Sequence, residues 1–155
     1  MEKIKEYSCY LFDADGTLMD TSELIYHSYR HVISQFKGTS VSREDIYSGI
    51  GIPLVQQIRA LFGNRGDEEL GEIIEAYRQY QFDIAEKHLQ LFPGVRDVLR
   101  ELKERGKMCA VVTSRMLPSL LVYFKSLSIH NFFDFFITPE LTEKHKPKPD
   151  PILKA

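Results

Sequence analysis

The chain has 155 residues, of which 43% are hydrophobic and 27% charged, a composition typical of a globular protein with one domain, or with one domain and a lid. The formal net charge of −2 gives no reason to expect a nucleic acid or an anionic membrane surface as partner, because both require clustered positive charge. No apolar run approaches the roughly 20 residues of a membrane span, and the charged first residues lack the apolar core of a secretory signal.

The first predicted element is a short buried strand at residues 8–12, which is apolar and aromatic and is followed by a glycine turn. After the turn at residues 13–17, the block of residues 18–90 is predicted to be all helix. The first helix of this block should begin near Thr21 or Ser22 and extend to Phe36, because its apolar residues recur at helical spacing.

Three further helices are expected within the block. Ser42 and Asp45 have the spacing of a capping box, so a short helix should begin there. Pro53 suits the first turn of the next helix, which should stop at the following glycine. Asp67 is expected to cap a long helix that continues to about Leu89.

After residue 90 the pattern changes to helices that alternate with strands. The expected elements are a helix over 95–105, a strand over 108–112 that is buried on both faces, a helix over 118–127, a strand over 132–137 and the opening of a helix over 151–155. This order implies parallel pairing through right-handed crossovers. The sequence therefore predicts an α/β fold. Residues 1–17 and 91–155 would form a Rossmann-like parallel sheet core, and residues 18–90 an inserted α-helical domain.

The two cysteines, Cys9 and Cys109, both fall inside apolar runs that resemble strands. Neither has a Cys or His neighbour at the spacing of a metal site. We therefore expect reduced thiols in the core of a cytoplasmic protein.

Polar residues follow all three predicted strands, at the edge of a parallel sheet where ligands bind. Asp13-Ala14-Asp15-Gly16-Thr17 follows the first strand, Thr113-Ser114-Arg115 the second, and the basic, proline-rich segment 144–150 the third. The two aspartates could form an Asx-type turn. However, two carboxylates at a buried strand end cost free energy unless a cation compensates them.

The segments FDADGTL, VVTS and KPKPDP, in this order, resemble the motifs of the haloacid-dehalogenase superfamily of phosphotransferases. The helical insertion after the first motif is similar to that of members with an α-helical cap, among them phosphoglycolate phosphatase and related small-molecule phosphatases. The resemblance implies a Mg²⁺-dependent phosphatase that hydrolyses a small phosphorylated metabolite, a phosphate monoester, through an aspartyl-phosphate intermediate.

The resemblance also assigns roles to the charged motif residues. Asp13 would be the nucleophile and Asp15 the general acid/base. Because dehalogenating members lack the second carboxylate, the pair favours phosphotransfer over dehalogenation. Lys146 would offset the charge of Asp13 and the phosphate. Mg²⁺ would be held by the Asp13 carboxylate and the main-chain carbonyl of Asp15.

Phosphate binding would come from the second motif and from the turn after the first. The Thr113 hydroxyl and the Ser114 N–H would hold phosphoryl oxygens, and Gly16 would let main-chain N–H groups face the phosphate. Two alternatives remain open: Thr113 could simply cap the helix that begins near Met116, and Lys146 could belong to a solvated basic loop.

Two histidines in the helical block invite a different interpretation. His27 and His31 stand one helical turn apart near Glu23 and could be drawn as a zinc site. Without further ligands, packed or solvated helix residues are the preferred interpretation. The residues that select a substrate should lie somewhere in 18–90, near Gly49 to Leu54.

The sequence departs from the family in one respect. The fourth motif, an acidic strand end of the GDxxxD kind that supplies another Mg²⁺ ligand, does not occur before the last residue, Ala155, and neither Asp134 nor Asp150 fits it. The later strands of the sheet would be missing too, which would leave part of the core uncovered. The chain could be a fragment of a longer phosphatase, which we favour, a chain completed by a partner, or a shortened relative without catalysis. A mutase or phosphonatase of the same family and a non-catalytic binding module are the alternative functions.

Overall fold

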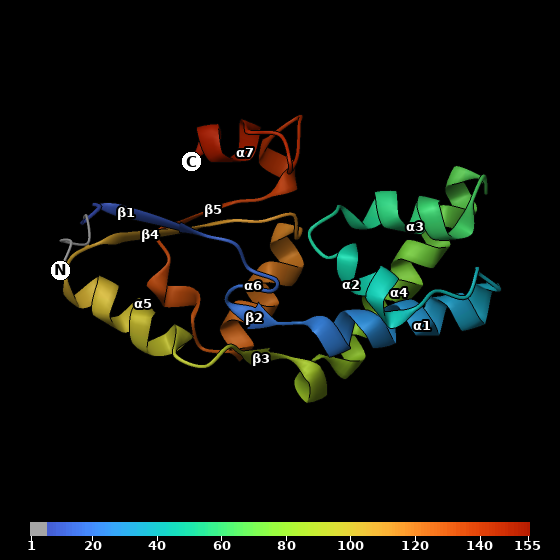
Figure 1. The fold of residues 1–155 in the computed structure, drawn as a ribbon, viewed down its shortest axis with the longest axis horizontal. Helices are drawn as coiled ribbons and strands as arrows, with labels where there is room; N and C mark the ends of the chain where they lie inside the picture. Colours follow the sequence, from blue (N-terminus) through green and yellow to red (C-terminus); the bar gives the residue numbers. More distant parts are fainter. Residues whose placement is uncertain (1–5) are drawn as a thin grey trace. The chain divides into compact units, whose positions relative to one another are not determined.

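The computed structural model describes residues 6–155, which divide into two compact units. The core unit contains the described chain up to Leu18 together with Leu91–Ala155, and the helical unit is Met19–Gln90. Figure 1 labels the elements of both. The charged first residues, on which the expectation of no secretory signal partly rests, lie outside the described residues.

The core unit is built on a parallel sheet of three strands in the order β1–β4–β5. The strands are β1 (Cys9–Phe12), β4 (Met108–Val112) and β5 (Phe135–Ile137). Phe12 is aligned with Val111, and Val112 with Ile137. The three carboxyl ends therefore lie at one edge of the sheet, and the predicted parallel α/β fold is confirmed.

The strands differ in burial. β4 is buried except for Met108 at its start, in agreement with its uninterrupted apolar run. β1 is not buried, and the prediction of a buried first strand is wrong: Leu11 is 42% exposed and the other three residues are intermediate. Within the described residues β1 pairs with β4 alone and forms an edge of the sheet. For the same reason Cys9 is half-buried, whereas Cys109 in the central strand is fully buried.

The third strand is shorter than predicted. Phe132 closes a 3-10 turn, η1 (His130–Phe132), and pairing begins only at Phe135. Between them Asp134 contacts β4 with both its main chain and its side chain: its N–H donates to the Cys109 carbonyl at 2.8 Å, and its carboxylate accepts from the Cys109 N–H at 2.8 Å. The carboxylate takes the place that a strand carbonyl would occupy, so the regular ladder starts after this residue.

Helices follow the strands of the core unit as the alternating pattern predicts. They are α5 (Val95–Glu104), α6 (Leu117–Ser126) and α7 (Asp150–Lys154), with a second 3-10 turn, η2 (Pro139–Leu141). Leu99 of α5 and Leu120 and Phe124 of α6 are completely buried.

The helical unit contains α1 (Ser22–Phe36), α2 (Arg43–Ser48), α3 (Leu54–Phe62) and α4 (Asp67–His88). The capping box of Ser42 and Asp45 is confirmed, because the side chain of each residue accepts the N–H of the other. Asp67 does not cap α4 but is its first helical residue, after Gly66. No helix within residues 6–155 is both long and apolar enough to cross a membrane.

The expectation that residues 18–90 are all helix is wrong at both ends of the block. Two short strands, β2 (Met19–Asp20) and β3 (Gln90–Leu91), pair with each other in a separate sheet. They lie where the chain passes from one unit to the other. A strand of two residues is too short to show the alternation of apolar and polar residues by which a strand is recognised in a sequence.

The histidines of the helical unit are packed against aromatic rings. The ring of His31 stacks on Tyr80 with 3.9 Å between centroids, and that of His27 lies 4.7 Å from His88 at the end of α4. Burial lowers the pKa of His88, and the positive charges of His27 and Lys87 lower it further, against a smaller opposite effect of Glu23.

We predict that Leu99→Ala destabilises the core unit by about 2–5 kcal/mol, because it leaves a cavity under α5. The neighbouring Val98 is 50% exposed, so Val98→Ala should change stability by about 0.5 kcal/mol or less. Urea denaturation followed by circular dichroism measures both. Equal losses for the two variants would contradict the packing described for α5.

A second prediction concerns pH. The unfolded chain protonates His88 near pH 6.5, whereas the folded chain does so only at lower pH. Stability should therefore be complete above that value and decrease as the pH falls below it. Melting temperatures between about pH 8 and pH 5 should fall more steeply for the wild type than for His88→Gln. His130→Gln, in the core unit, is the control and should follow the wild type.

Candidate active site

Asp13 is the first residue after β1 and forms an ion pair with Lys146. The Lys146 Nζ lies 2.9 Å from Oδ2 of Asp13 and donates a hydrogen bond of 2.7 Å to the main-chain oxygen of Val112. One ammonium group thus joins the carboxyl ends of β1 and β4. Lys146 is therefore not a solvated loop charge. The pair is still accessible, since the lysine side chain is 26% and the aspartate 36% exposed.

The turn after β1 is organised around Ala14. Its N–H donates to Oδ1 of Asp13 at 2.7 Å, and its carbonyl accepts from the N–H of Leu18 at 2.9 Å. Gly16 lies inside this turn with a φ of 74°, in the left-handed region. A Cβ at Gly16 would meet no atom within 4 Å, so glycine is required here for its backbone conformation and not for space.

Asp15 forms a bidentate ion pair with Arg115, the third residue after β4. Nε of Arg115 donates to Oδ2 at 2.9 Å, and Nη2 donates to Oδ1 at 2.7 Å. This pair is much less exposed than the first, at 10% for the arginine side chain and 13% for the aspartate. The guanidinium also lies over the ring of Tyr123, 4.8 Å from its centroid.

Thr113 and Ser114 occupy the end of the central strand. The Thr113 N–H continues the ladder to the carbonyl of Ile137 at 3.0 Å, and its hydroxyl accepts from the Arg115 N–H at 3.1 Å. Helix α6 is capped by Met116 without a side-chain hydrogen bond, so the alternative that Thr113 caps this helix is wrong. The buried hydroxyl of Ser114 has no hydrogen-bond partner among the described residues.

The formal charges of the two ion pairs cancel. When both are ionised, Asp13 and Asp15 contribute two negative charges, and Lys146 and Arg115 contribute two positive ones. The resemblance to the family motifs implies no role for Arg115. Its position directly after the VVTS motif was the only signal, because no pattern along the chain links it to an acid 100 residues away.

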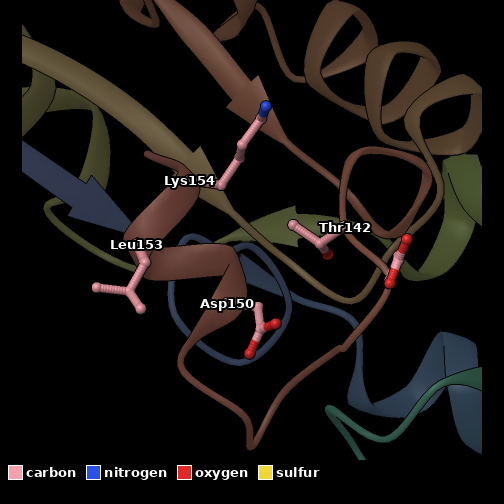
Figure 2. A pocket seen from close by; sticks show the side chains of 5 residues that line it. Thr142, Asp150, Leu153 and Lys154 are labelled. Carbon is pink, nitrogen blue, oxygen red and sulfur yellow. The ribbon is translucent and has the colours of Figure 1, made fainter.

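Asp134 and Asp150, the acidic residues that do not fit the fourth motif, have other surroundings. Asp134 lies just before β5, at the opposite edge of the sheet from the two ion pairs. Lys103 binds Asp134 at 2.8 Å, and its hydrogen bond, followed by that of the Cys109 N–H, holds the pKa of Asp134 below its usual range. Asp150 lines a shallow hollow of the core unit (Figure 2), together with Thr142, Glu143, Leu153 and Lys154. None of the predicted site residues lines this hollow. Within residues 6–155 no group of three or more His, Cys, Asp or Glu residues is arranged to hold a metal ion.

Comparison with known proteins adds the following. A family model described as haloacid dehalogenase-like hydrolase matches residues 10–155. A candidate pyrophosphatase PpaX of Clostridium perfringens is 35% identical over 145 residues, which cover 94% of this chain and 66% of that protein. The chain thus spans slightly less than two thirds of the length of the curated relatives it matches.

Solved structures show the same fold. A haloacid dehalogenase-like hydrolase from Bacteroides fragilis superposes with a TM-score of 0.85 at 27% identity, covering 97% of this chain and 71% of that one. A protein from Haemophilus somnus, named a predicted phosphoglycolate phosphatase, gives a TM-score of 0.84 over 98% of this chain and 71% of its own. At 19% identity this second likeness concerns the fold alone.

We predict opposite effects for alanine at two glycines. Gly16→Ala should destabilise the core unit by about 1–2 kcal/mol, because the left-handed backbone strains any residue with a Cβ. Gly71, inside α4, has open space around it, so Gly71→Ala should stabilise the helical unit by about 0.5–1 kcal/mol. Thermal unfolding of both variants tests this, and a neutral Gly16→Ala would contradict the strained turn.

Proposed function

This chain belongs to the haloacid dehalogenase-like hydrolase family, and on that premise we propose that it is a phosphatase that hydrolyses a small phosphate monoester by way of a phosphoryl group carried on Asp13. The observation that carries the proposal is the pairing of Asp13 with Lys146 at 2.9 Å, at the edge where the parallel strands end. A carboxylate is a competent nucleophile towards phosphorus. The adjacent ammonium offsets the charge that an incoming phosphate adds.

The proposed reaction has two steps. Asp15 enters the first step as a protonated carboxyl, having taken a proton from solvent. An oxygen of Asp13 attacks phosphorus, the bond from phosphorus to the leaving oxygen breaks, and the carboxyl of Asp15 gives its proton to that oxygen. In the second step the Asp15 carboxylate takes a proton from water while the water oxygen attacks phosphorus. The bond between phosphorus and Asp13 breaks, inorganic phosphate leaves, and both aspartates return to their starting states.

The second motif would bind the transferred group. The Ser114 hydroxyl is buried without a hydrogen-bond partner in the described chain, and such a group is stabilised when a ligand oxygen completes its bonding. Thr113, the preceding residue at the end of β4, also carries a hydroxyl, and the residue is 4% exposed. Together with main-chain N–H groups of the turn at Gly16, these residues would hold the phosphoryl oxygens.

The residues present fit Mg²⁺ as the cofactor. With both aspartates ionised the ion pairs of the site are neutral in sum, so the Lys146 ammonium offsets only part of the negative charge that a phosphate dianion adds. Mg²⁺ prefers oxygen ligands and is often bound by only one or two carboxylates together with waters and substrate phosphate, which suits a site without a cluster of three acids among residues 6–155. The carboxylate of Asp13 and the main-chain carbonyl of Asp15 would hold it. When bound, the ion would supply positive charge next to the transferred phosphoryl group.

The substrate would be a small phosphorylated metabolite. The α-helical cap proposed for residues 18–90 would select it. The phosphoglycolate-like monoester implied by the motifs is the first candidate. Inorganic pyrophosphate is the second, because the curated relatives carry the name pyrophosphatase PpaX. Both present a terminal phosphoryl group to the same nucleophile.

Asp13→Asn tests the proposal. In the presence of Mg²⁺ the wild-type chain should release phosphate from p-nitrophenyl phosphate, and the variant should lose activity by about 10³-fold or more, because an amide does not attack phosphorus. EDTA should abolish the wild-type activity and added Mg²⁺ should restore it. Asp97→Asn, which alters an exposed acid of α5, is the matched control and should leave turnover unchanged.

The alternatives give different results in the same assay. Full activity of Asp13→Asn would refute the assigned nucleophile. Release of phosphate from neither p-nitrophenyl phosphate, 2-phosphoglycolate nor pyrophosphate by the wild-type chain would favour a binding module without catalysis. Transfer of the phosphoryl group to a second position of a sugar phosphate, without free phosphate, would indicate a mutase.

A further inference from the structure

Arg115 is a charged residue at the strand ends to which neither the motifs nor the proposed reaction gives a task. Its guanidinium donates two parallel hydrogen bonds to the carboxylate of Asp15, at 2.9 and 2.7 Å. The bidentate fork fixes both the plane and the direction of the carboxylate, which a single contact to a lysine would not do. Asp15 is thereby tied to the segment that follows β4.

The arginine is itself held from two directions. Its guanidinium rests on the face of Tyr123, a residue of α6 that is only 2% exposed, and its main-chain N–H donates to the Thr113 hydroxyl. Burial raises the pKa of Tyr123, so its phenol stays neutral at physiological pH and presents an uncharged ring to the cation. Neither partner of the fork is free to move as a solvated side chain would.

The low exposure of the pair argues against a surface ion pair that happens to form. A solvated pair contributes little and exchanges freely with water, as does the exposed pair of Arg100 with Asp97. Taking an arginine and an aspartate out of water has a desolvation cost, which only near-ideal geometry and further contacts offset. The geometry at Asp15 meets that requirement.

We propose that Arg115 is a positioning residue: it holds the Asp15 carboxyl where a proton can pass between it and the leaving oxygen. The fork uses one lone pair of each carboxylate oxygen, so a second lone pair on each can carry the transferred proton. The inference rests on the proposed phosphatase reaction. Proton transfer requires the carboxyl oxygen to lie within hydrogen-bond distance of the oxygen that receives the proton, so an unrestrained Asp15 would be out of place in most of its rotamers.

This role predicts a dependence on the leaving group. Nitrophenolate is a weak base that leaves without a proton, whereas phenolate is a much stronger base and needs one. Phenyl phosphate and p-nitrophenyl phosphate are nearly equal in shape, so in the first step they differ mainly in their need for the Asp15 proton. The second step, in which Asp15 acts on water, is the same for both esters. Loss of Arg115 should therefore slow the release of phenol much more than that of nitrophenol.

The experiment compares Arg115→Gln, Arg115→Lys and Asp15→Asn, with Arg100→Gln as the exposed control, at one pH and saturating Mg²⁺. We expect Arg115→Gln to lower kcat/KM, which reports only the steps up to formation of the aspartyl-phosphate, by about 10²-fold for phenyl phosphate and by about 10-fold or less for p-nitrophenyl phosphate. Arg115→Lys should recover part of kcat/KM for phenyl phosphate, because it restores the charge without the fork. Arg100→Gln should behave as the wild type.

Two measurements distinguish a positioning role of Arg115 from a purely structural one. Far-UV circular dichroism and melting temperature report whether each variant is folded. A variant that acts only by reducing the folded fraction would lose the same factor for both substrates, which would overturn the proposal. In the double variant Asp15→Asn with Arg115→Gln, the arginine change should have no further effect on phenyl phosphate, because a positioning residue has nothing left to position.

Failure of the inference is distinct from failure of the proposed function. Two results would show that Arg115 does not position Asp15 while the phosphatase reaction stands, provided that the wild type and Arg100→Gln hydrolyse both esters. In the first, Arg115→Gln loses the same factor of activity on both esters. In the second, the losses of activity caused by Asp15→Asn and Arg115→Gln are additive in the double variant. If the wild-type chain releases phosphate from neither ester, the phosphatase proposal fails and the role of Arg115 fails with it.

Discussion

The parallel pairing of β4 with β1 on one side and with β5 on the other is the constraint on which the rest of the site depends. In this register Phe12 lies beside Val111, so the segment after β1 and the segment after β4 emerge at the same edge of the sheet. An ammonium held by the Val112 carbonyl can then reach the Asp13 carboxylate. A slip of the register by one residue would separate these groups and turn the apolar side chains of β4 to the opposite face.

The two ion pairs at this edge have different physical characters. Lys146 and Asp13 are partly exposed, and the lysine is a compact cation on a flexible chain that can move its contact from carboxylate to phosphate. Arg115 and Asp15 are nearly buried and joined by two parallel hydrogen bonds over an aromatic ring. The first pair suits a nucleophile that must change partners, and the second suits a proton carrier that must keep its place. The roles proposed for the two aspartates come from the motifs of the family, and they agree with this difference in burial and geometry.

Several features of the fold could be predicted because they depend on neighbours along the chain. The capping box of Ser42 and the apolar run of β4 are local patterns, and the structure confirms both. The errors have non-local causes. β1 was expected to be buried from its composition, but burial depends on what packs beside a strand, and within the described residues β1 has one neighbour. The start of β5 was misplaced because the Asp134 side chain takes the hydrogen bond of a strand carbonyl at Cys109.

The sequence alone determined the α/β fold and the family, because the strand and helix periodicities and the FDADGTL, VVTS and KPKPDP segments are written in consecutive residues. It also selected the aspartates and the lysine as candidates by their place in those segments. Only the tertiary structure decided which charges meet. The bond between Arg115 and Asp15 spans 100 residues, and a hydrogen bond of that kind depends on strand register and on burial by Tyr123, neither of which is encoded in any short pattern.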